Sequence, residues 1–368
     1  MPLQFVYSRQ DFVSDVFGQR DGPSMTSSLT DFDRIVQAGW TDRMERGLFR
    51  YRLGDLQSRV LPGPHGFVAQ LNVERGIERR KPQEILSIQQ EFNPKQFNFN
   101  KINPDEILFE MLEATDGGEL SSSHCRMVVL VNVSPLEFGH CLFVPDPSRC
   151  FPQILTPFAI QVGIESVLLS SQTAFRVGFN SLGAFASINH LHLHGYYLHY
   201  NLRIESVPVQ PLIPHKGMYL CDFPAGFLFY AERKEVREVA KAVCQVTDYL
   251  VKENIAHNVF LTRGSPPGEK DCCLRRGVRI VVWPRLSCFG AKEESAFNVA
   301  LCELAGHLPF KNKTDFELVT EEAAIEILQR HLLPSDEFQH LKKRLFDQLM
   351  CKEPEITSFP ASEDFRKV

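Results

Sequence analysis

Two apolar runs rich in β-branched residues place the strongest constraint on the fold of this chain. They span residues 127–131 and 141–144 and flank a turn region that contains Ser134, Pro135 and Gly139. Such runs on either side of turn residues are typical of paired strands. A second pair is predicted for the segments HNVFLTR and RGVRIVVWPR, which enclose a polar loop with glycine and proline. The chain is therefore predicted to contain antiparallel sheet.

Helical periodicity occurs between and around these strands. Apolar residues recur every three or four positions in the segment REVAKAVCQVTDYLVKENI, which is the pattern of an amphipathic helix. Further helices are predicted over residues 31–51, 157–175, 320–330 and 335–350. Strand pairs interspersed with helices favour an α+β fold, in which helices pack on an antiparallel sheet.

A weak internal similarity hints that this fold is duplicated. The segments GHCLFVP and GVRIVVWP each join a glycine, an apolar run and a proline inside a similar hairpin. The composition changes after Pro208 and Pro211, and we place a boundary there. The predicted organisation is a loose N-terminal tail (1–30), a first half that carries the site discussed below (31–212), a second half (213–350) and a C-terminal tail (351–368).

Composition and motifs argue against several classes of protein. The formal net charge of −5 and the pI of about 6.2 favour neither a nucleic-acid partner nor an acidic membrane surface. No run approaches the roughly 20 apolar residues that span a bilayer, and the N-terminus lacks the apolar centre of a signal peptide. The ten cysteines form no CxxC pair, which argues against a zinc ribbon and favours a reducing compartment, the cytoplasm.

Three of the twelve histidines lie in the segment INHLHLHGYY, at positions His190, His192 and His194. Every second side chain of a strand points to the same face, so a strand here places three imidazoles in a row with leucines packed behind them. The preceding segment SLGAFAS is rich in small residues, which lets the backbone approach a ligand closely. The sequence therefore predicts a site lined by histidines.

Three interpretations of these histidines are open. They could be incidental residues of a half-exposed strand. They could bind zinc or iron, which requires further ligands, although no acidic residue or CxxC pair lies nearby in the sequence. They could also attack phosphorus: a neutral imidazole, held in one tautomer, forms a covalent bond to a phosphoryl group while backbone amides stabilise the charge, with no metal or cofactor required. We favour this third interpretation.

Several segments of the chain resemble those of a known family. They are WTDRMERGLFRY (40–51), GFVAQLN (66–72), FNFNK (97–101), VNVSPLEFGHCLFVP (131–145), RVGFNSLGAFASINHLHLHGYYL (176–198) and ELAGHLPFK (303–311). The sequence is similar to the histidine-triad superfamily and, within it, to the GDP-hexose phosphorylases of the galactose-1-phosphate uridylyltransferase branch. The resemblance implies a histidine-triad-like antiparallel sheet with packed helices, in two tandem halves.

The resemblance also implies roles for individual residues. His192 takes the position of the nucleophile and His190 that of the residue that orients it. His194 stands where the plant enzymes and the uridylyltransferases have glutamine, and either side chain can donate to a phosphate oxygen. Contacts to the nucleotide or its phosphates are expected from Asn180, Ser187, Asn132, Asn98 and Lys101.

Some of these residues have a simpler structural interpretation. Asn132 can shape a turn, and the segment that contains Asn98 and Lys101 can be a solvated loop. We interpret His140 as structural, the pair Glu303 and His307 as an ordinary surface or core pair, and the charged run IERRKPQE as a solvated face.

By resemblance, the expected activity is phosphorolysis of GDP-D-glucose by inorganic phosphate. The products are glucose 1-phosphate and GDP, and the intermediate is a guanylyl group bonded to His192. Two alternatives stay open: a nucleotide-sugar hydrolase, in which water replaces phosphate, and a non-catalytic regulator that binds a guanine nucleotide.

Overall fold

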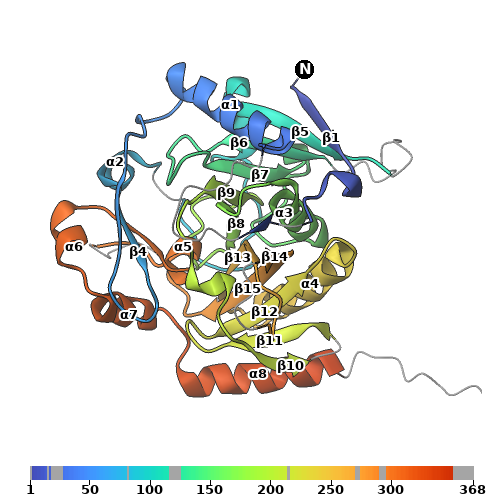
Figure 1. Cartoon of the computed structure of the whole chain (residues 1–368), viewed down its shortest axis with the longest axis vertical. Helices are drawn as coiled ribbons and strands as arrows, with labels where there is room; N and C mark the ends of the chain where they lie inside the picture. Colours follow the sequence, from blue (N-terminus) through green and yellow to red (C-terminus); the bar gives the residue numbers. More distant parts are fainter. Residues whose placement is uncertain are drawn as a thin grey trace, which may run out of the picture. The chain divides into compact units, whose positions relative to one another are not determined.

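The computed structural model describes residues 2–14, 16–17, 28–80, 83–115, 126–213, 216–269, 274–289 and 296–350. Eleven of its strands form one sheet, and helices pack against that sheet (Figure 1). The predicted α+β fold is confirmed. No helix among the described residues is long and apolar enough to cross a membrane.

Ten of the eleven strands of the main sheet belong to two halves with the same order of elements along the chain: three strands, one helix and two strands. The first half contains β5 (Ile107–Glu113), β6 (Met127–Val131), β7 (Cys141–Pro145), α3 (Pro157–Leu169), β8 (Phe175–Asn180) and β9 (Leu193–Tyr197). The second half contains β10 (Gln210–Ile213), β11 (Met218–Cys221), β12 (Gly226–Ala231), α4 (Val236–Lys252), β13 (Ala256–Gly264) and β15 (Gly277–Arg285).

The two halves also have the same arrangement in space. The strand order is β5-β6-β7-β9-β8 in the first half and β13-β15-β12-β11-β10 in the second, so each half runs fourth, fifth, third, second and first strand outward from the centre. The antiparallel pair β8 and β13 joins the halves, with Asn180 opposite Asn258. The predicted duplication is confirmed, and the second half begins with β10, slightly before the boundary predicted at 212/213.

The pair of segments that suggested this duplication is not equivalent in the fold. GHCLFVP contains β7, the third strand of the first half, whereas GVRIVVWP is part of β15, the fifth strand of the second half. The topological partner of β15 is instead the histidine-bearing β9. Both β7 and β15 are buried along their whole length. Central strands of this kind share an apolar composition wherever they lie in a sheet, and the match reflected burial rather than position.

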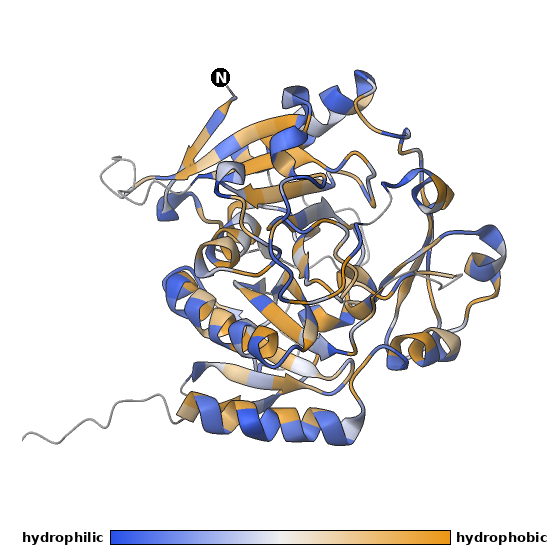
Figure 2. Ribbon diagram, turned by 180° about the vertical axis from the view of Figure 1, so that it is seen from behind, coloured by the Kyte–Doolittle hydropathy of each residue, from blue (hydrophilic) through white to orange (hydrophobic). Residues whose placement is uncertain are grey.

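Helices α3 and α4 pack together on one face of the sheet (Figure 1). Helix α3 is buried along most of its length, whereas α4 has a hydrophilic and a hydrophobic side, as predicted (Figure 2). The side chains of Val177 and Leu193 lie against Gly163 of α3. Because successive side chains of a strand alternate between faces, their neighbours Gly178 and His194 face the opposite side of the sheet.

Distant parts of the chain meet on that opposite side. A second sheet joins β3 (Gln57–Val60), β4 (Val68–Leu71) and β16 (His307–Phe310), in which β4 and β16 are parallel although far apart in sequence. Because the two strands are parallel, α2 (Val73–Glu78), which follows β4, lies beside the residues that follow β16: Lys311 packs against Gly76. Helix α5 (Leu301–Leu304) precedes β16. Leu301 of α5 lies directly against Gly178 of β8.

The N-terminal segment is more ordered than predicted. Residues Gln4–Tyr7 form β1, which pairs in parallel with β5, so the expectation of a loose tail over 1–30 is wrong here. Phe5 and Tyr7 are buried, and the Tyr7 hydroxyl donates to Glu165 of α3 over 2.6 Å. A four-residue run with only two inward side chains is too short to be distinguished from a tail by periodicity. Residues 18–27 and the predicted C-terminal tail, 351–368, lie outside the described residues.

The remaining elements surround these sheets. They are β2 (Val16–Phe17) paired with β14 (Leu274–Arg275), and the helices α1 (Asp31–Glu45), α6 (Lys313–Leu318) and α7 (Glu321–Gln329). Helix α8 (Ser335–Met350) belongs to a separate compact unit that begins at Pro334. The helices α1, α7 and α8 lie within or close to the ranges predicted for them.

Candidate active site

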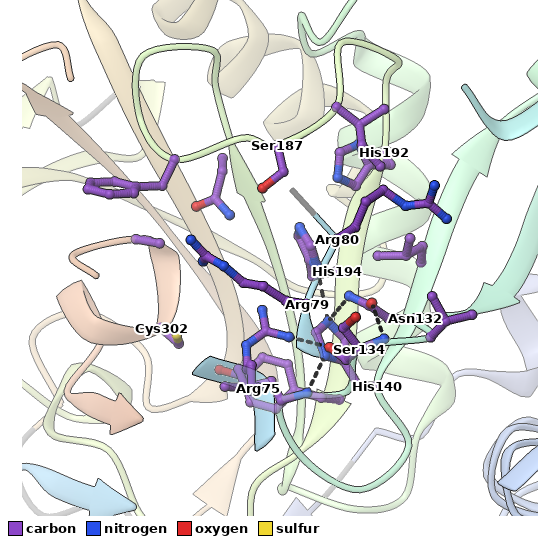
Figure 3. Close-up of a pocket in the computed structure, with 18 of the residues that line it drawn as sticks. Arg75, Arg79, Arg80, Asn132, Ser134, His140, Ser187, His192, His194 and Cys302 are labelled. Atoms are coloured by element: carbon purple, nitrogen blue, oxygen red, sulfur yellow. Dashed lines mark hydrogen bonds between the residues drawn. The ribbon is translucent and has the colours of Figure 1, made fainter. Parts of the chain in front are cut away.

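A cavity of about 310 Å³ lies beside the histidine segment (Figure 3). Its walls come from five parts of the chain: residues 72–80 around α2, 97–106, 130–142, 180–196 with the histidine segment, and 298–311 around α5 and β16. Of the three predicted catalytic histidines, His192 and His194 line this cavity and His190 does not. The cavity is thus formed jointly by a motif visible in the sequence and by segments brought to it by the fold.

The histidine segment is not one continuous strand. Strand β9 begins at Leu193, so His190 and His192 precede it and the predicted row of three imidazoles on one strand face is wrong. The side chain of Gln153 replaces a strand neighbour at this point. Its carbonyl oxygen accepts from the His192 backbone N–H (3.0 Å), and its amide donates to the carbonyl oxygens of His192 (3.1 Å) and Asn180 (2.9 Å). Gln153 is buried and was not identified from the sequence.

The ring of His192 is held in one tautomer. Its Nδ1 lies 2.8 Å from the carbonyl oxygen of His190, which can only accept, so Nδ1 carries the proton. The other nitrogen, Nε2, is then unprotonated. Burial lowers the pKa of His192 to about 4, which keeps the ring neutral at physiological pH. His192 therefore has the two properties that a nucleophilic imidazole requires: a free lone pair and a fixed orientation.

His190 orients His192 through its backbone rather than through its ring. The ring of His190 is buried, its Nδ1 accepts from the backbone N–H of Phe99 (3.1 Å), and it packs against Phe92 and Phe99. Burial, followed by the charge of His192, lowers the pKa of His190 to about 4. The orienting role predicted for His190 thus belongs to its carbonyl oxygen.

His194 is held in the opposite tautomer by a chain of two hydrogen bonds. The backbone N–H of Leu136 donates to Nδ1 of His140 over 2.7 Å. Burial lowers the pKa of His140 well below its ordinary value, so the ring is neutral and its single proton lies on Nε2. That proton is donated to Nδ1 of His194, 3.1 Å away, and the proton of His194 lies on Nε2. His194 therefore presents a donor, where His192 presents a lone pair. His140 was interpreted as structural from the sequence. In the structure it determines the tautomer of His194 by donating to its Nδ1.

Asn132 lies beside the same pair of rings. Its carbonyl oxygen accepts from the backbone N–H of Ser134 (3.1 Å), as expected for a residue that shapes a turn, and its side chain also lines the cavity. Its amide nitrogen lies 3.2 Å from Nε2 of His140. A neutral ring cannot accept from both Leu136 and Asn132. We assign the accepted bond to Leu136 because that contact is the shorter of the two.

The remaining predicted residues separate into two groups. Asn180 and Ser187 line the cavity. The side-chain oxygen of Asn180, Oδ1, already accepts from the side-chain amide of Asn258 (2.6 Å) and from the backbone N–H of Leu301 (3.0 Å), which leaves the side-chain amide hydrogens of Asn180 for a ligand. Asn98 and Lys101 do not line the cavity.

Asn98 and Lys101 hold their own loop together. Asn98 is buried and caps the short helix η2 (Phe99–Lys101) through the backbone N–H of Asn100. Lys101 donates to the carbonyl oxygens of Lys95 (3.1 Å) and Gln96 (2.7 Å). The expectation that these two side chains contact the phosphates is therefore replaced by a role in loop structure.

Among the residues that the structure describes, four cationic side chains line the cavity, and none of them was identified as a site residue from the sequence. They are Arg75, Arg79, Arg80 and Lys311. The interpretation of the run IERRKPQE as a solvated face is wrong for Arg79 and Arg80, which the β4–β16 pairing brings to the site. Arg75 donates to the carbonyl oxygen of Ser134. Burial, followed by the charge of Arg75, lowers the pKa of Arg79. A partly desolvated cluster of cations favours a multiply charged anion.

Glu303 and His307 lie close to the site but do not form a pair. Glu303 lines the cavity, and its carboxylate accepts from the backbone N–H of Ala300 (2.8 Å). His307 is buried and contacts the side chain of Gln70 (2.9 Å). Within the part of the chain that the structure describes, no three side chains of His, Cys, Asp or Glu are grouped so that they could hold a metal ion.

Comparison with known proteins extends this description. Residues 31–196 match the family model "GDPGP1-like, N-terminal domain", and residues 204–352 match "GDPGP1-like, C-terminal domain". GDP-D-glucose phosphorylase 1 of Danio rerio is 57% identical over 346 residues, which cover 93% of this chain and 97% of that protein. The Homo sapiens protein of the same name is 49% identical (93% and 90% covered). GDP-L-galactose phosphorylase 1 of Arabidopsis thaliana is 30% identical (88% and 75% covered).

The fold itself is shared with a solved structure. The yeast Ap4A phosphorylase Apa2, crystallised with Ap4A, superimposes with a TM-score of 0.52 at 14% identity and covers 83% of this chain and 98% of its own. At this identity the likeness concerns the fold alone. The relatives confirm the resemblance to the GDP-hexose phosphorylases that the sequence motifs suggested. Both family models match, and they cover most of the sequence, so the chain belongs to the GDPGP1-like family.

Proposed function

We propose that the chain is a nucleotidyltransferase that catalyses phosphorolysis of GDP-D-glucose to glucose 1-phosphate and GDP. The observation that carries this proposal is the fixed tautomer of His192, which leaves Nε2 unprotonated. The ring of His192 lines the cavity, and the neighbouring ring of His194 presents a hydrogen-bond donor. The names of the similar proteins supply the substrate class, since they act on GDP-hexoses. The cationic cluster supports the same assignment, because both substrates carry phosphate.

In the first step, the lone pair of His192 Nε2 attacks the α-phosphorus of GDP-D-glucose. An N–P bond forms, the bond from the α-phosphorus to the bridging oxygen breaks, and glucose 1-phosphate leaves with the bonding electrons. The imidazole becomes cationic, and its Nδ1–H bond to the carbonyl oxygen of His190 strengthens accordingly. The Nε2 proton of His194 and the amide of Asn180 are donors for the nonbridging oxygens.

In the second step, an oxygen of inorganic phosphate attacks the same phosphorus. The N–P bond breaks, its electrons return to Nε2, and GDP leaves. An in-line displacement places the attacking phosphate where glucose 1-phosphate departed. Arg75, Arg79 and Lys311 provide positive charge for that position in both steps. The donors and the positive charge named here belong to side chains, and we expect activity to persist in EDTA.

The cytoplasm is the compartment that we propose for this reaction. Cys141, Cys221 and Cys302 are buried free thiols, and burial raises the pKa of Cys221 to about 12. Buried unpaired thiols are ordinary in proteins of a reducing compartment. These thiols support a cytoplasmic location.

Phosphate dependence tests the proposed function. The purified protein is incubated with GDP-D-glucose, with and without inorganic phosphate and with and without EDTA, and the nucleotide products are separated by chromatography. We expect repeated turnover to GDP and glucose 1-phosphate in equal amounts only when phosphate is present; without phosphate, release of glucose 1-phosphate should stop at about one equivalent per protein molecule. Release of GMP without phosphate would instead identify a hydrolase. No turnover, together with no mass increase of the protein after exposure to GDP-D-glucose, would favour the non-catalytic regulator.

The low pKa of His192 predicts an unusual pH dependence for the first step. The ring with its pKa of about 4 stays unprotonated between pH 7.5 and 5.5. The rate of the pre-steady-state burst of glucose 1-phosphate, measured without phosphate by rapid quench, should then change by less than about twofold over this range. If the ring had the ordinary pKa near 6.5, the burst rate would fall about tenfold at pH 5.5, because only about a tenth of the protein molecules would have an unprotonated ring. A tenfold decrease would contradict the assigned environment of His192.

A further inference from the structure

One end of the cavity is apolar and adjoins the nucleophile. Its walls are Phe97, Phe99, Ile102, Leu130, Leu142 and Ile188, which pack in one hydrophobic cluster. The ring centroid of Phe99 lies 5.1 Å from that of His192. The cationic residues Arg75 and Lys311 line the cavity together with Ser134 and Asn298, to which they are bonded. An apolar site beside the attacking nitrogen fits the base of a nucleotide whose α-phosphate is attacked.

Arg80 and Phe97 form a stacking surface for a flat group at the apolar end of the cavity. The guanidinium of Arg80 lies 3.5 Å from the ring centroid of Phe97, in a cation–π contact, and both side chains line the cavity. Aromatic rings and guanidinium groups are the side chains on which nucleobases stack. The apolar walls accept any base, since every base has a π-face, and so they do not select one.

The acidic residue Glu106 lines the cavity together with these apolar residues. It ends the short helix η3 (Pro104–Glu106), which follows Ile102 in the chain. One of its carboxylate oxygens, Oε1, accepts from the backbone N–H of Asn103 (3.3 Å). Burial raises the pKa of Glu106 overall, and that hydrogen bond and the charges of Arg80 and Arg50 offset only part of the rise. Among the described residues, one other carboxylate lines the cavity, that of Glu303, and it accepts from the backbone N–H of Ala300.

A carboxylate distinguishes guanine from the other bases. The Watson–Crick edge of guanine has two adjacent donors, the N1 hydrogen and the 2-amino group, and a carboxylate has two acceptors at matching spacing. The same edge of adenine, cytosine or uracil places an acceptor in at least one of these positions, and that acceptor would face a negative oxygen. We propose that Glu106 selects guanine by accepting from its N1 hydrogen and its 2-amino group. This inference rests on the proposed function for the identity of the substrate.

The test compares two substrates that differ only in the 2-amino group. GDP-glucose and IDP-glucose are assayed with the wild-type protein and with Glu106→Gln, which keeps the shape of the side chain but replaces one acceptor with a donor. The wild type should prefer GDP-glucose by about tenfold or more in kcat/KM, the effect of one charge-assisted hydrogen bond. In Glu106→Gln the preference should fall to within about twofold. An unchanged preference would overturn the assignment.

The neighbouring residue provides a matched control. Asp105 belongs to the same short helix but is exposed, where it pairs with Arg46 over 2.8 Å. Asp105→Asn removes one negative charge from the same helix and should leave the GDP-glucose preference within twofold of the wild-type value. If Glu106→Gln proves poorly folded by circular dichroism, Glu106→Ala gives the same comparison. An equal loss of preference in Asp105→Asn would show that net charge, rather than contact with the base, controls the selection.

A binding measurement separates this inference from the proposed function. The affinities of GMP and IMP are measured by calorimetry for the wild type and for Glu106→Gln, without any turnover. A wild-type preference for GMP that disappears in the variant supports base recognition by Glu106, even if neither nucleotide sugar is cleaved. If GDP-glucose is cleaved but GMP and IMP bind equally well, the proposed phosphorylase function would stand and the role of Glu106 would be refuted.

Discussion

Replacement of His192 with asparagine is expected to abolish phosphorolysis of GDP-D-glucose, with a decrease in kcat of at least about a thousandfold. Asparagine has no ring nitrogen that can form the N–P bond, and none of the neighbouring rings can take its place. His190 is buried with its Nδ1 bonded to Phe99, and Nδ1 of His194 is bonded to His140. The decrease is measured as release of glucose 1-phosphate.

Two further measurements make this expectation specific to the nucleophile. Without phosphate, the wild-type protein should gain the mass of one guanylyl group after exposure to GDP-D-glucose, and His192→Asn should gain none. His199 lies two residues beyond β9, is exposed and does not line the cavity, so His199→Asn should keep kcat within about twofold. Turnover near the wild-type value in a folded His192→Asn protein would eliminate the covalent route.

The parts of the fold that follow from local patterns could be predicted from the sequence. The strands β6, β7, β13 and β15 are apolar runs beside turn residues, and the helix α4 has an apolar periodicity; neither signal depends on distant residues. The start of β9 could not be predicted in this way. The alternation of histidine and leucine has the period of a strand, but the side chain of Gln153, 39 residues away in sequence, occupies the hydrogen-bonding positions of His192.

The residues of the site could likewise be predicted only where they belong to a local sequence motif. The histidine motif is local and could be recognised together with Asn180 and Ser187. The arginines of the cavity depend on the pairing of β4 with β16, strands separated by more than 200 residues, and their run of charges is indistinguishable from a solvated loop. Arg79 and Arg80 follow GFVAQLN closely, and this proximity to a segment that matched the family was the one signal that could have identified them. Asn98 was expected to contact the nucleotide, but its side chain caps a short helix. This role requires only neighbouring residues, so membership in a motif did not reveal it.

The tautomer of His194 leads to the second large effect that we expect. His194→Ala removes the donor presented to the phosphate oxygens and should lower kcat by about a hundredfold to a thousandfold, as for other donors that stabilise a developing negative charge. His194→Gln should retain activity within about tenfold of the wild type, because its amide can also donate. Both values come from steady-state assays of glucose 1-phosphate release, with thermal unfolding as the control for folding. A similar loss in both variants would show that an imidazole, and not a donor, is required at this position.

His140 acts through His194, and this relation can be measured separately from stability. In His140→Leu the hydrogen bond that keeps the proton of His194 on Nε2 is absent, so part of the population presents a lone pair to the phosphate instead of a donor. We expect kcat to decrease about tenfold, with little change in KM, when His194 is present. In the His194→Ala background the same substitution should have no further effect on kcat, since there is no ring left to orient. Independent, multiplicative losses would instead mean that His140 supports only the structure around Leu136. A non-additive result would establish that one backbone amide, through two imidazoles, determines which nitrogen of His194 faces the phosphate.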